Sequence, residues 1–114
     1  MPDDCLFCRM ASGELPVDKV HEDDLVFAIR DINPQAPTHV LVIPVKHVAS
    51  AAVLGNQDAG LLARLVTVAA DIARREGLDN GWRLVTNVGP DGGQSVNHLH
   101  LHLLGGRQMG WPPG

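Results

Sequence analysis

Features typical of membrane proteins and of nucleic-acid-binding proteins are missing from this sequence of 114 residues. It has no long apolar run, and Asp3 and Asp4 stand where a signal peptide would carry positive charge. Thirteen acidic residues outnumber nine lysines and arginines, and the formal net charge of -4 argues against binding nucleic acid through its phosphates. We therefore expect a cytoplasmic protein that binds neither a membrane nor a nucleic acid.

Cysteine is also scarce, and the only two, Cys5 and Cys8, are separated by two residues. In a reducing compartment such a pair is more often half of a metal site or a redox pair than a structural disulfide. A redox pair of this kind follows a strand and begins a helix, and the few residues before Cys5 leave no room for that strand. The spacing therefore favours a metal site.

No internal repeat, linker or low-complexity tract divides the chain. The hydrophobic content of 45% and the charged content of 19% are typical of a folded protein, and 114 residues can bury a core without several disulfides. We expect a single domain over residues 1–114.

Hydrophobic periodicity predicts two helices. The first is short, covers residues 5–12 and ends at Gly13. The second has Asn56 as its N-cap, runs to about Glu76 and ends at Gly77. Its apolar stripe predicts that it packs on a sheet.

Five short strands are predicted around these helices. They cover 17–21, 25–30, 38–44, 82–88 and the histidine-rich stretch that follows a glycine-rich loop at 89–93. A hairpin turn at 22–24, a loop at 31–37 and an irregular tail at 105–114 complete the chain. Hairpin-length connections around one long helix indicate an α+β protein with a five-stranded antiparallel sheet, one long helix and one short helix.

The chain is organised around three histidines at alternate positions, His98, His100 and His102. If this segment is extended, the three imidazoles share one face, about 7 Å apart, while the leucines between them share the other. The leucine face is typical of a core. The histidine face is typical of a site, because no ordinary solvent-facing strand needs three histidines.

Two kinds of chemistry suit such a row. Two imidazoles can hold a metal ion with a third ligand, or a neutral imidazole can attack phosphorus while a neighbour stabilises the phosphate charge. The preceding Gly92-Gly93-Gln94-Ser95 offers amide and hydroxyl donors, and Asn87 adds another. Carboxylates that could orient metal-bound histidines are scarce apart from Asp91. Phosphate chemistry is therefore the better interpretation.

Residues 98–104 match the alternating histidine motif of the histidine triad superfamily. The resemblance extends to residues 31–39, 42–47, 87, 91–96 and 105–114, and therefore covers nearly the whole chain. The C-terminal segment is similar to that of the Hint branch rather than to the dinucleoside polyphosphate hydrolases. The resemblance implies a HIT-like fold and a homodimer whose C-terminal tail lies near the partner's active site.

The same resemblance implies a purine nucleoside phosphoramidase. Such an enzyme hydrolyses the P–N bond of adenosine or guanosine 5'-monophosphoramidates through a nucleotidyl-histidine intermediate, and needs no metal for catalysis. By position, His100 is the nucleophile and His39 lies behind it. The α-phosphate would be held by His102, Gln94, Ser95 and the amide of Gly93, with Ser95 also near the leaving nitrogen.

Nucleotide-binding residues also follow from the resemblance. Asn87 would face the phosphate or the ribose, and Asp31 would bind the ribose. The base pocket would be lined by Phe7, Met10, Leu15, Ile29 and Ile32. Core packing is the alternative for Phe7, Met10, Leu15 and Ile29, and a turn-forming role is the alternative for Asp31.

The cysteine pair resembles that of a bacterial subset of histidine triad proteins that bind zinc. Transferred by position, the ligands are Cys5, Cys8, His47 and His98, a closed Cys₂His₂ set of structural type. The alternative is a reduced pair without metal. His21 has no assigned role and is expected at a surface or strand end.

Three other functions compete with a phosphoramidase. One is a zinc-binding, nucleotide-binding scaffold or regulatory protein that works through partners. The second is a metalloenzyme with His100 and His102 as catalytic ligands. The third is a dinucleoside polyphosphate hydrolase.

Overall fold

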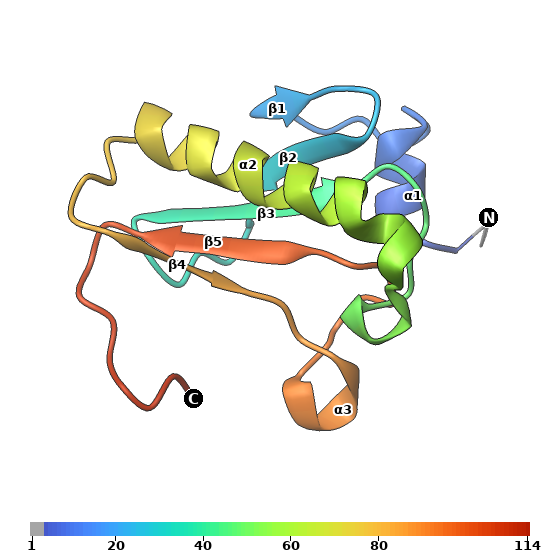
Figure 1. Ribbon diagram of the computed structural model, residues 1–114. Coiled ribbons are helices and arrows are strands. Elements are labelled where there is room, and N and C mark those ends of the chain that lie inside the picture. The colour runs from blue at the N-terminus through green and yellow to red at the C-terminus, as the bar shows by residue number, and fades with distance from the viewer. Residues whose placement is uncertain (1–3) are drawn as a thin grey trace.

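A computed structural model describes residues 4–114 and contains a five-stranded antiparallel sheet in the order β1-β2-β3-β5-β4 (Figure 1). The strands are β1 (His21–Glu22), β2 (Val26–Arg30), β3 (Thr38–Pro44), β4 (Trp82–Val85) and β5 (Leu101–Gly105). The predicted α+β class and antiparallel sheet are confirmed. Asp3, cited above against a signal peptide, lies outside the described residues.

The two predicted helices are present. Helix α1 (Leu6–Ala11) has Cys5 as its N-cap, whose sulfur accepts the backbone N–H of Cys8, and Gly13 follows with a φ of +84°. Helix α2 (Ala59–Arg75) is followed by Gly77 with a φ of +72°. Both glycines adopt the left-handed conformation that stops a helix.

The start of α2 differs from the prediction that Asn56 is its N-cap. Asn56 instead opens a 3₁₀ turn over Asn56–Asp58, and the α-helix begins at Ala59. The carboxylate of Asp58 accepts the backbone N–H of Gly55 at 2.9 Å, which closes this turn before the helix begins. A second 3₁₀ turn covers Ala51–Val53.

Two predicted strands are shorter than expected. The first strand covers only His21 and Glu22, although the N–H of Val20 also donates to the carbonyl of Ala28. Val17 lies before the strand and packs against the smaller apolar cluster. The predicted strand 82–88 ends at Val85, whose partner is His102, because β5 begins only one residue earlier.

The glycine-rich segment before the histidines is not the irregular loop that we predicted. Residues Gly89–Gly92 form one helical turn, α3, in which Pro90 takes a first-turn position. Proline is favoured there because its fixed φ suits a helix and its missing N–H would have no intrahelical partner. Gly93 ends the turn with a φ of +79°.

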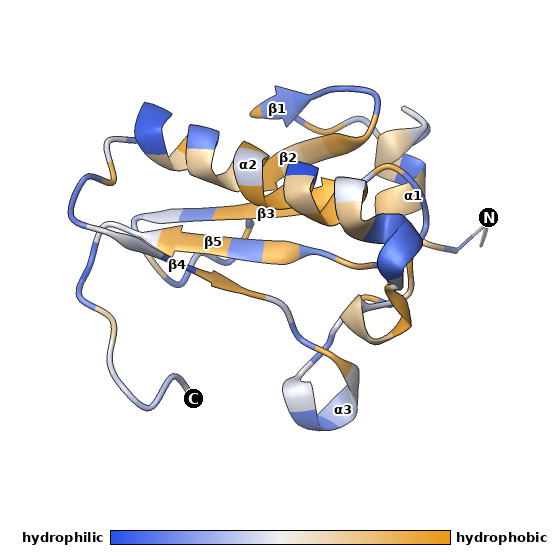
Figure 2. Cartoon of the chain, in the orientation of Figure 1, coloured by the Kyte–Doolittle hydropathy of each residue, from blue (hydrophilic) through white to orange (hydrophobic). Residues whose placement is uncertain are grey.

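The sheet has a different apolar layer on each face. Helix α2 lies across one face of the sheet (Figure 1), and its apolar stripe is buried against β2, β3 and β5. Figure 2 shows that the strands beneath the helix are largely hydrophobic. This larger cluster includes Leu65, Val68 and Ile72 of the helix. On the opposite face a smaller cluster joins α1 to the sheet: Cys5, Phe7, Cys8, Phe27, Ile29, Leu41 and Ile43.

Within residues 4–114, none of the helices is both long enough and apolar enough to cross a membrane.

Candidate functional site

Alternation places the leucines and the histidines on opposite faces of the sheet, as predicted. Leu99, Leu101 and Leu103 belong to the cluster under α2. His100 and His102 lie on the face of α1, with ring centroids 5.1 Å apart. The alternation begins before the regular strand, because β5 starts at Leu101.

Helix α1 contributes an aromatic wall to this face. The ring of Phe7 meets His98 and His100 edge-on, with centroid distances of 5.7 and 5.2 Å. His98 and His100 are both buried, and His102 is half-buried. The three imidazoles therefore have separate environments and are not one equivalent row.

Hydrogen bonding determines which nitrogen of His100 carries its proton. Nδ1 of His100 lies 2.7 Å from the carbonyl oxygen of His98. A carbonyl can only accept, so Nδ1 donates, and in the neutral ring Nε2 keeps its lone pair. His100 thus has the form that a nitrogen nucleophile requires.

A second chain of hydrogen bonds orients His102. The backbone N–H of Gln35 donates to Nδ1 of His39 at 3.0 Å, so neutral His39 carries its proton on Nε2. That nitrogen lies 2.9 Å from Nδ1 of His102 and 3.4 Å from a carboxylate oxygen of Asp31. His102 accepts on Nδ1 and is left with a donor on Nε2.

Burial keeps both of these histidines neutral. Burial lowers the pKa of His39, although the negative charge of Asp31 acts in the opposite direction. Burial also lowers the pKa of His102, and charge repulsion from His100 and His39 lowers it further. Asp31, His39 and His102 are close enough to hold an ion. However, the proton on Nε2 of His39 makes this group a proton chain rather than a ligand set.

A different cluster has the donors of a metal site. Ligand atoms of Cys5, Cys8, His47 and His98 all lie within 4.8 Å of one another. The Cys5 sulfur is 3.3 Å from Nδ1 of His98, the Cys8 sulfur is 3.3 Å from Nδ1 of His47, and the two Nδ1 atoms are 3.1 Å apart. A tetrahedron with zinc–sulfur and zinc–nitrogen bonds of usual length has edges of about 3.3–3.8 Å. The cluster fits such an ion.

The tautomer of His98 also suits a metal ligand. Nε2 of His98 lies 2.8 Å from the carbonyl oxygen of Pro44 and must donate to it, so Nδ1 presents its lone pair to the sulfurs. Burial lowers the pKa of His98, which keeps the ring neutral. Burial also raises the pKa of the Cys8 thiol to about 11, with a further contribution from Cys5. The two cysteines are not joined by a disulfide.

His98 belongs to both parts of the site. Its ring lies in the Cys₂His₂ cluster, and its carbonyl oxygen holds Nδ1 of His100. Movement of the His98 backbone would therefore reach the ring of His100 directly.

The predicted phosphate-binding residues lie in the turn just before the histidines. Ser95 is exposed, and Asn87 is half-buried beside Gly92. The Gln94 side chain accepts from the N–H of Gly89 and donates to the carbonyls of Ala49 and Val96. Gln94 thus stabilises the turn that carries Gly93 and Ser95. The N–H of Gly93 donates to the carbonyl of Pro90 at 3.1 Å, so the predicted phosphate donors of Gln94 and Gly93 are used in hydrogen bonds within the protein instead.

The predicted base-pocket residues are only partly brought together. Phe7 and Ile29 are buried in the smaller cluster, and Met10 packs against it. Leu15 is half-buried outside that cluster, and Ile32 is fully exposed. Asp31 accepts the N–H of Asn33 through one oxygen, which confirms that it shapes the turn.

His21, which had no predicted role, is a strand-end residue. It begins β1, and its Nε2 lies 2.6 Å from the carboxylate of Asp23. Asp23 also accepts two hydrogen bonds from Arg64 of α2. These side chains join the β1–β2 hairpin to α2. Strand β1 is separated from β5 by β2 and β3 in the sheet.

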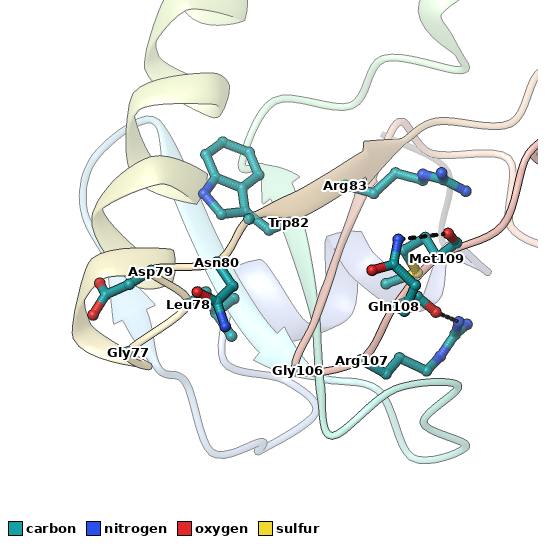
Figure 3. Close-up of a pocket in the computed structure, with 11 residues that line it drawn as sticks. Gly77, Leu78, Asp79, Asn80, Trp82, Arg83, Gly106, Arg107, Gln108 and Met109 are labelled. Carbon is teal, nitrogen blue, oxygen red and sulfur yellow. Dashed lines mark hydrogen bonds between the residues drawn. The ribbon is translucent and has the colours of Figure 1, made fainter.

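Sequence reasoning missed a cavity of about 610 Å³ at the end of the sheet (Figure 3). It lies between residues 77–83, which connect α2 to β4 and begin that strand, and residues 106–109, which follow β5. No motif in either segment signals a cavity, because it forms only when the two segments meet.

A family model described as the HIT domain matches residues 12–109. The chain belongs to the HIT domain family. It is 50% identical over 111 residues to a 14 kDa zinc-binding protein of Zea mays, covering 96% of this chain and 87% of the relative.

Solved HIT structures share the fold. A HIT family hydrolase from Legionella pneumophila matches with a TM-score of 0.95 and 54% identity, covering 97% of this chain and all of that one. A histidine triad nucleotide-binding protein from Candida albicans matches with a TM-score of 0.80 and 30% identity, covering 96% of this chain and 83% of that one. The predicted superfamily and fold are confirmed.

Proposed function

We propose that this HIT protein is a nucleotide hydrolase of the Hint branch, a purine nucleoside phosphoramidase. It hydrolyses the P–N bond of adenosine and guanosine 5'-monophosphoramidates through a nucleotidyl intermediate on His100. The structural relatives described as a hydrolase and as a nucleotide-binding protein support this class.

The observation that carries the proposal is the hydrogen bond from Nδ1 of His100 to the carbonyl of His98. It leaves the lone pair of Nε2 for attack on the α-phosphorus. As the Nε2–P bond forms, the P–N bond breaks, and its electron pair takes a proton that Ser95 relays from solvent to the leaving amine. Water then attacks phosphorus and loses a proton to solvent, the electron pair of the Nε2–P bond returns to Nε2, and the nucleoside monophosphate is released.

Neighbouring donors stabilise the charge that builds up on the phosphoryl oxygens. His102 donates from Nε2, since His39 occupies its other nitrogen. Ser95 and Asn87 add donors on either side of the turn that Gln94 holds in place, whereas the N–H of Gly93 donates to the carbonyl of Pro90 within that turn.

The nucleoside part is assigned to the face of α1. Phe7, Met10, Leu15, Ile29 and Ile32 line the base pocket, and Asp31 binds the ribose. The full exposure of Ile32 supports this assignment, since a large apolar side chain in water gains from covering a base.

A structural zinc ion is part of the proposal. Cys5, Cys8, His47 and His98 would hold it, and it would supply a rigid cross-link rather than catalysis. The fit of the cluster and the zinc-binding relative support it. Elemental analysis of protein purified under reducing conditions should find about one zinc per chain, and a metal-free preparation would contradict the assignment.

The decisive test is release of AMP from an adenosine 5'-phosphoramidate in the presence of a chelator. The wild type should turn over, and His100→Ala should lose at least about 10³-fold in kcat, because the covalent step is removed. His21→Ala, which removes a histidine on a distant strand, should retain wild-type kcat.

Other outcomes would favour the competing functions. Hydrolysis of diadenosine polyphosphates at a higher kcat/KM than phosphoramidates would favour the dinucleoside polyphosphate hydrolases. Activity that disappears with chelator while folding stays intact, and returns with zinc, would favour a catalytic metal. Nucleotide binding without turnover would favour a scaffold.

A further inference from the structure

The turn after β5 packs directly on the loop before β3. Gly106 has a φ of +93°, and a Cβ atom placed on it would lie only 2.9 Å from Cβ of Pro37. Glycine is needed for both the conformation and the close approach. The C-terminal turn and the loop 31–37 therefore form one packed unit at the end of the sheet.

Arg107 ties these two segments together by hydrogen bonds. Its Nε donates to the carbonyl of Gln35 at 3.0 Å, and its Nη1 donates to the carbonyl of Gln108 at 3.2 Å, the second of which is drawn in Figure 3. In the part of the chain that the structure describes, Arg107 forms no ion pair with a carboxylate. Its guanidinium therefore fixes backbone positions rather than neutralising a charge.

Gln35 connects Arg107 to the histidines. Its carbonyl accepts from Arg107, while its own N–H donates to Nδ1 of His39 at 3.0 Å. Its side chain donates to the carbonyl of Asn33 at 3.0 Å, which braces the same loop. The orientation of Gln35 thus depends on the C-terminal segment through Arg107. The same residue determines which nitrogen of His39 carries the proton.

We infer that Arg107 is a positioning residue for the reaction, acting through Gln35 on His39 and thereby on His102. Loss of the Arg107 bond would release the carbonyl of Gln35 and weaken the N–H bond to His39. Nδ1 of His39 could then take up a proton or turn away from His102. This inference rests on the proposed function, because it concerns the histidines assigned to that reaction.

The kinetic test compares three variants with the phosphoramidate substrate. Arg107→Ala should lower kcat about tenfold, within the usual effect of residues that orient a catalytic group, and change KM less than about twofold. Arg107→Lys keeps a donor for the Gln35 carbonyl and should recover most of the loss. Arg75→Ala is the matched control, because Arg75 also donates to a backbone carbonyl, that of Val20, from the end of α2.

A second readout does not depend on any activity. Nitrogen-15 NMR of wild-type protein near neutral pH should show Nδ1 of His39 unprotonated and Nε2 protonated. In Arg107→Ala, the tautomer signals should mix and the pKa of His39 should rise, while Asp31 and His102, the ionisable groups facing it, remain in place. Arg107→Lys and Arg75→Ala should keep the wild-type pattern.

The kinetic and NMR measurements distinguish failure of the proposed phosphoramidase activity from failure of the positioning role of Arg107. If the wild type fails to release AMP but the His39 signals change in Arg107→Ala, the proposed function is wrong and the positioning link survives. If the wild type is active and Arg107→Ala keeps both its kcat and its His39 tautomer, the positioning role is wrong. Equal losses in Arg107→Ala and Arg107→Lys, with unchanged His39 signals, would also overturn it.

Discussion

At the scale of single residues, the protonation states of His39 and His102 contribute to the pH range of the proposed activity. Burial lowers the pKa of both below the ordinary histidine value of 6.5. The neutral forms, which the hydrogen-bond chain requires, therefore persist below pH 6.5 and are lost only as the pH falls through the lowered pKa values.

We accordingly predict that kcat/KM keeps its plateau below pH 6.5 and declines only at more acid pH. A pH–rate profile of phosphoramidate hydrolysis checks this. An acid limb with an apparent pKa above 6.5 would contradict the lowered pKa values of this pair. A rate that falls as the pH rises through the histidine range would show that a protonated imidazole is the working form.

Single-residue chemistry could be predicted from the sequence only in part. The alternation of His98, His100 and His102 with leucine separated a site face from a core face, because strand geometry has a period of two. The tautomers could not be predicted, since they depend on the Pro44 carbonyl and the Gln35 amide, which are distant in sequence.

At the scale of elements, the contact between the β1–β2 hairpin and α2 depends on Asp23. Burial opposes ionisation of this carboxyl, but hydrogen bonds from His21, Leu25, Arg64 and Val26 outweigh it and hold its pKa well below the ordinary range. Because the pKa is lowered on folding, the stabilisation is complete above the unfolded value of about 4 and is lost as pH falls toward the folded value.

Asp23→Ala should lower the free energy of unfolding at pH 7 by about 2 kcal/mol, because it removes hydrogen bonds to a charged acceptor. Urea denaturation at pH 7 and at pH 3 measures the difference, which should shrink at the lower pH. The exposed neighbour provides a control, and Asp24→Ala should stay within about 0.5 kcal/mol of wild type. A pH-independent difference would contradict the linkage.

The type of a helix or strand could be predicted where the hydrophobic pattern extended over many residues. The residues at which helices and strands begin and end could not. The stripe of α2 and the seven buried residues of β3 have clear patterns. The short limits of β1 and β4 depend instead on where their partners begin, and the helical turn α3 depends on Pro90 at its start. Such limits are set by tertiary contacts that local sequence does not encode.

At the scale of the whole molecule, the surface outside the site bears on assembly. We propose that two chains associate as the Hint-type dimer, with the C-terminal tail near the partner's active site. Leu62 and Val66, one turn apart on α2, are 43% and 40% exposed, and Trp82 of edge strand β4 is 39% exposed. Exposed apolar groups of this kind support an interface.

Sedimentation equilibrium should therefore give twice the mass of one chain. Val66→Glu should shift the protein toward the monomer, because a charge would be buried in the contact. Thr67→Glu, one position along the helix and also exposed, is the matched control for the added charge. A wild type that sediments as a monomer at all concentrations would contradict the dimer.

Removal of the proposed zinc should destabilise the fold. A chelator should lower the melting temperature by about 10 °C, which corresponds to a loss of about 2 kcal/mol, and added zinc should restore it. Cys8→Ser should melt lower and respond little to chelator. Equal melting curves with and without chelator would show that the cluster does not hold an ion.

The position of α1 gives the cluster a consequence for local unfolding. Cys5 and His98 are 93 positions apart in sequence, so an ion there would fasten the first helix to the segment that leads into β5. Without it, α1 keeps only a small apolar contact and should open before the sheet does. Hydrogen exchange in chelator should therefore accelerate in α1 while β3 stays protected, and affinity for the base should fall, because Phe7 and Met10 leave with the helix.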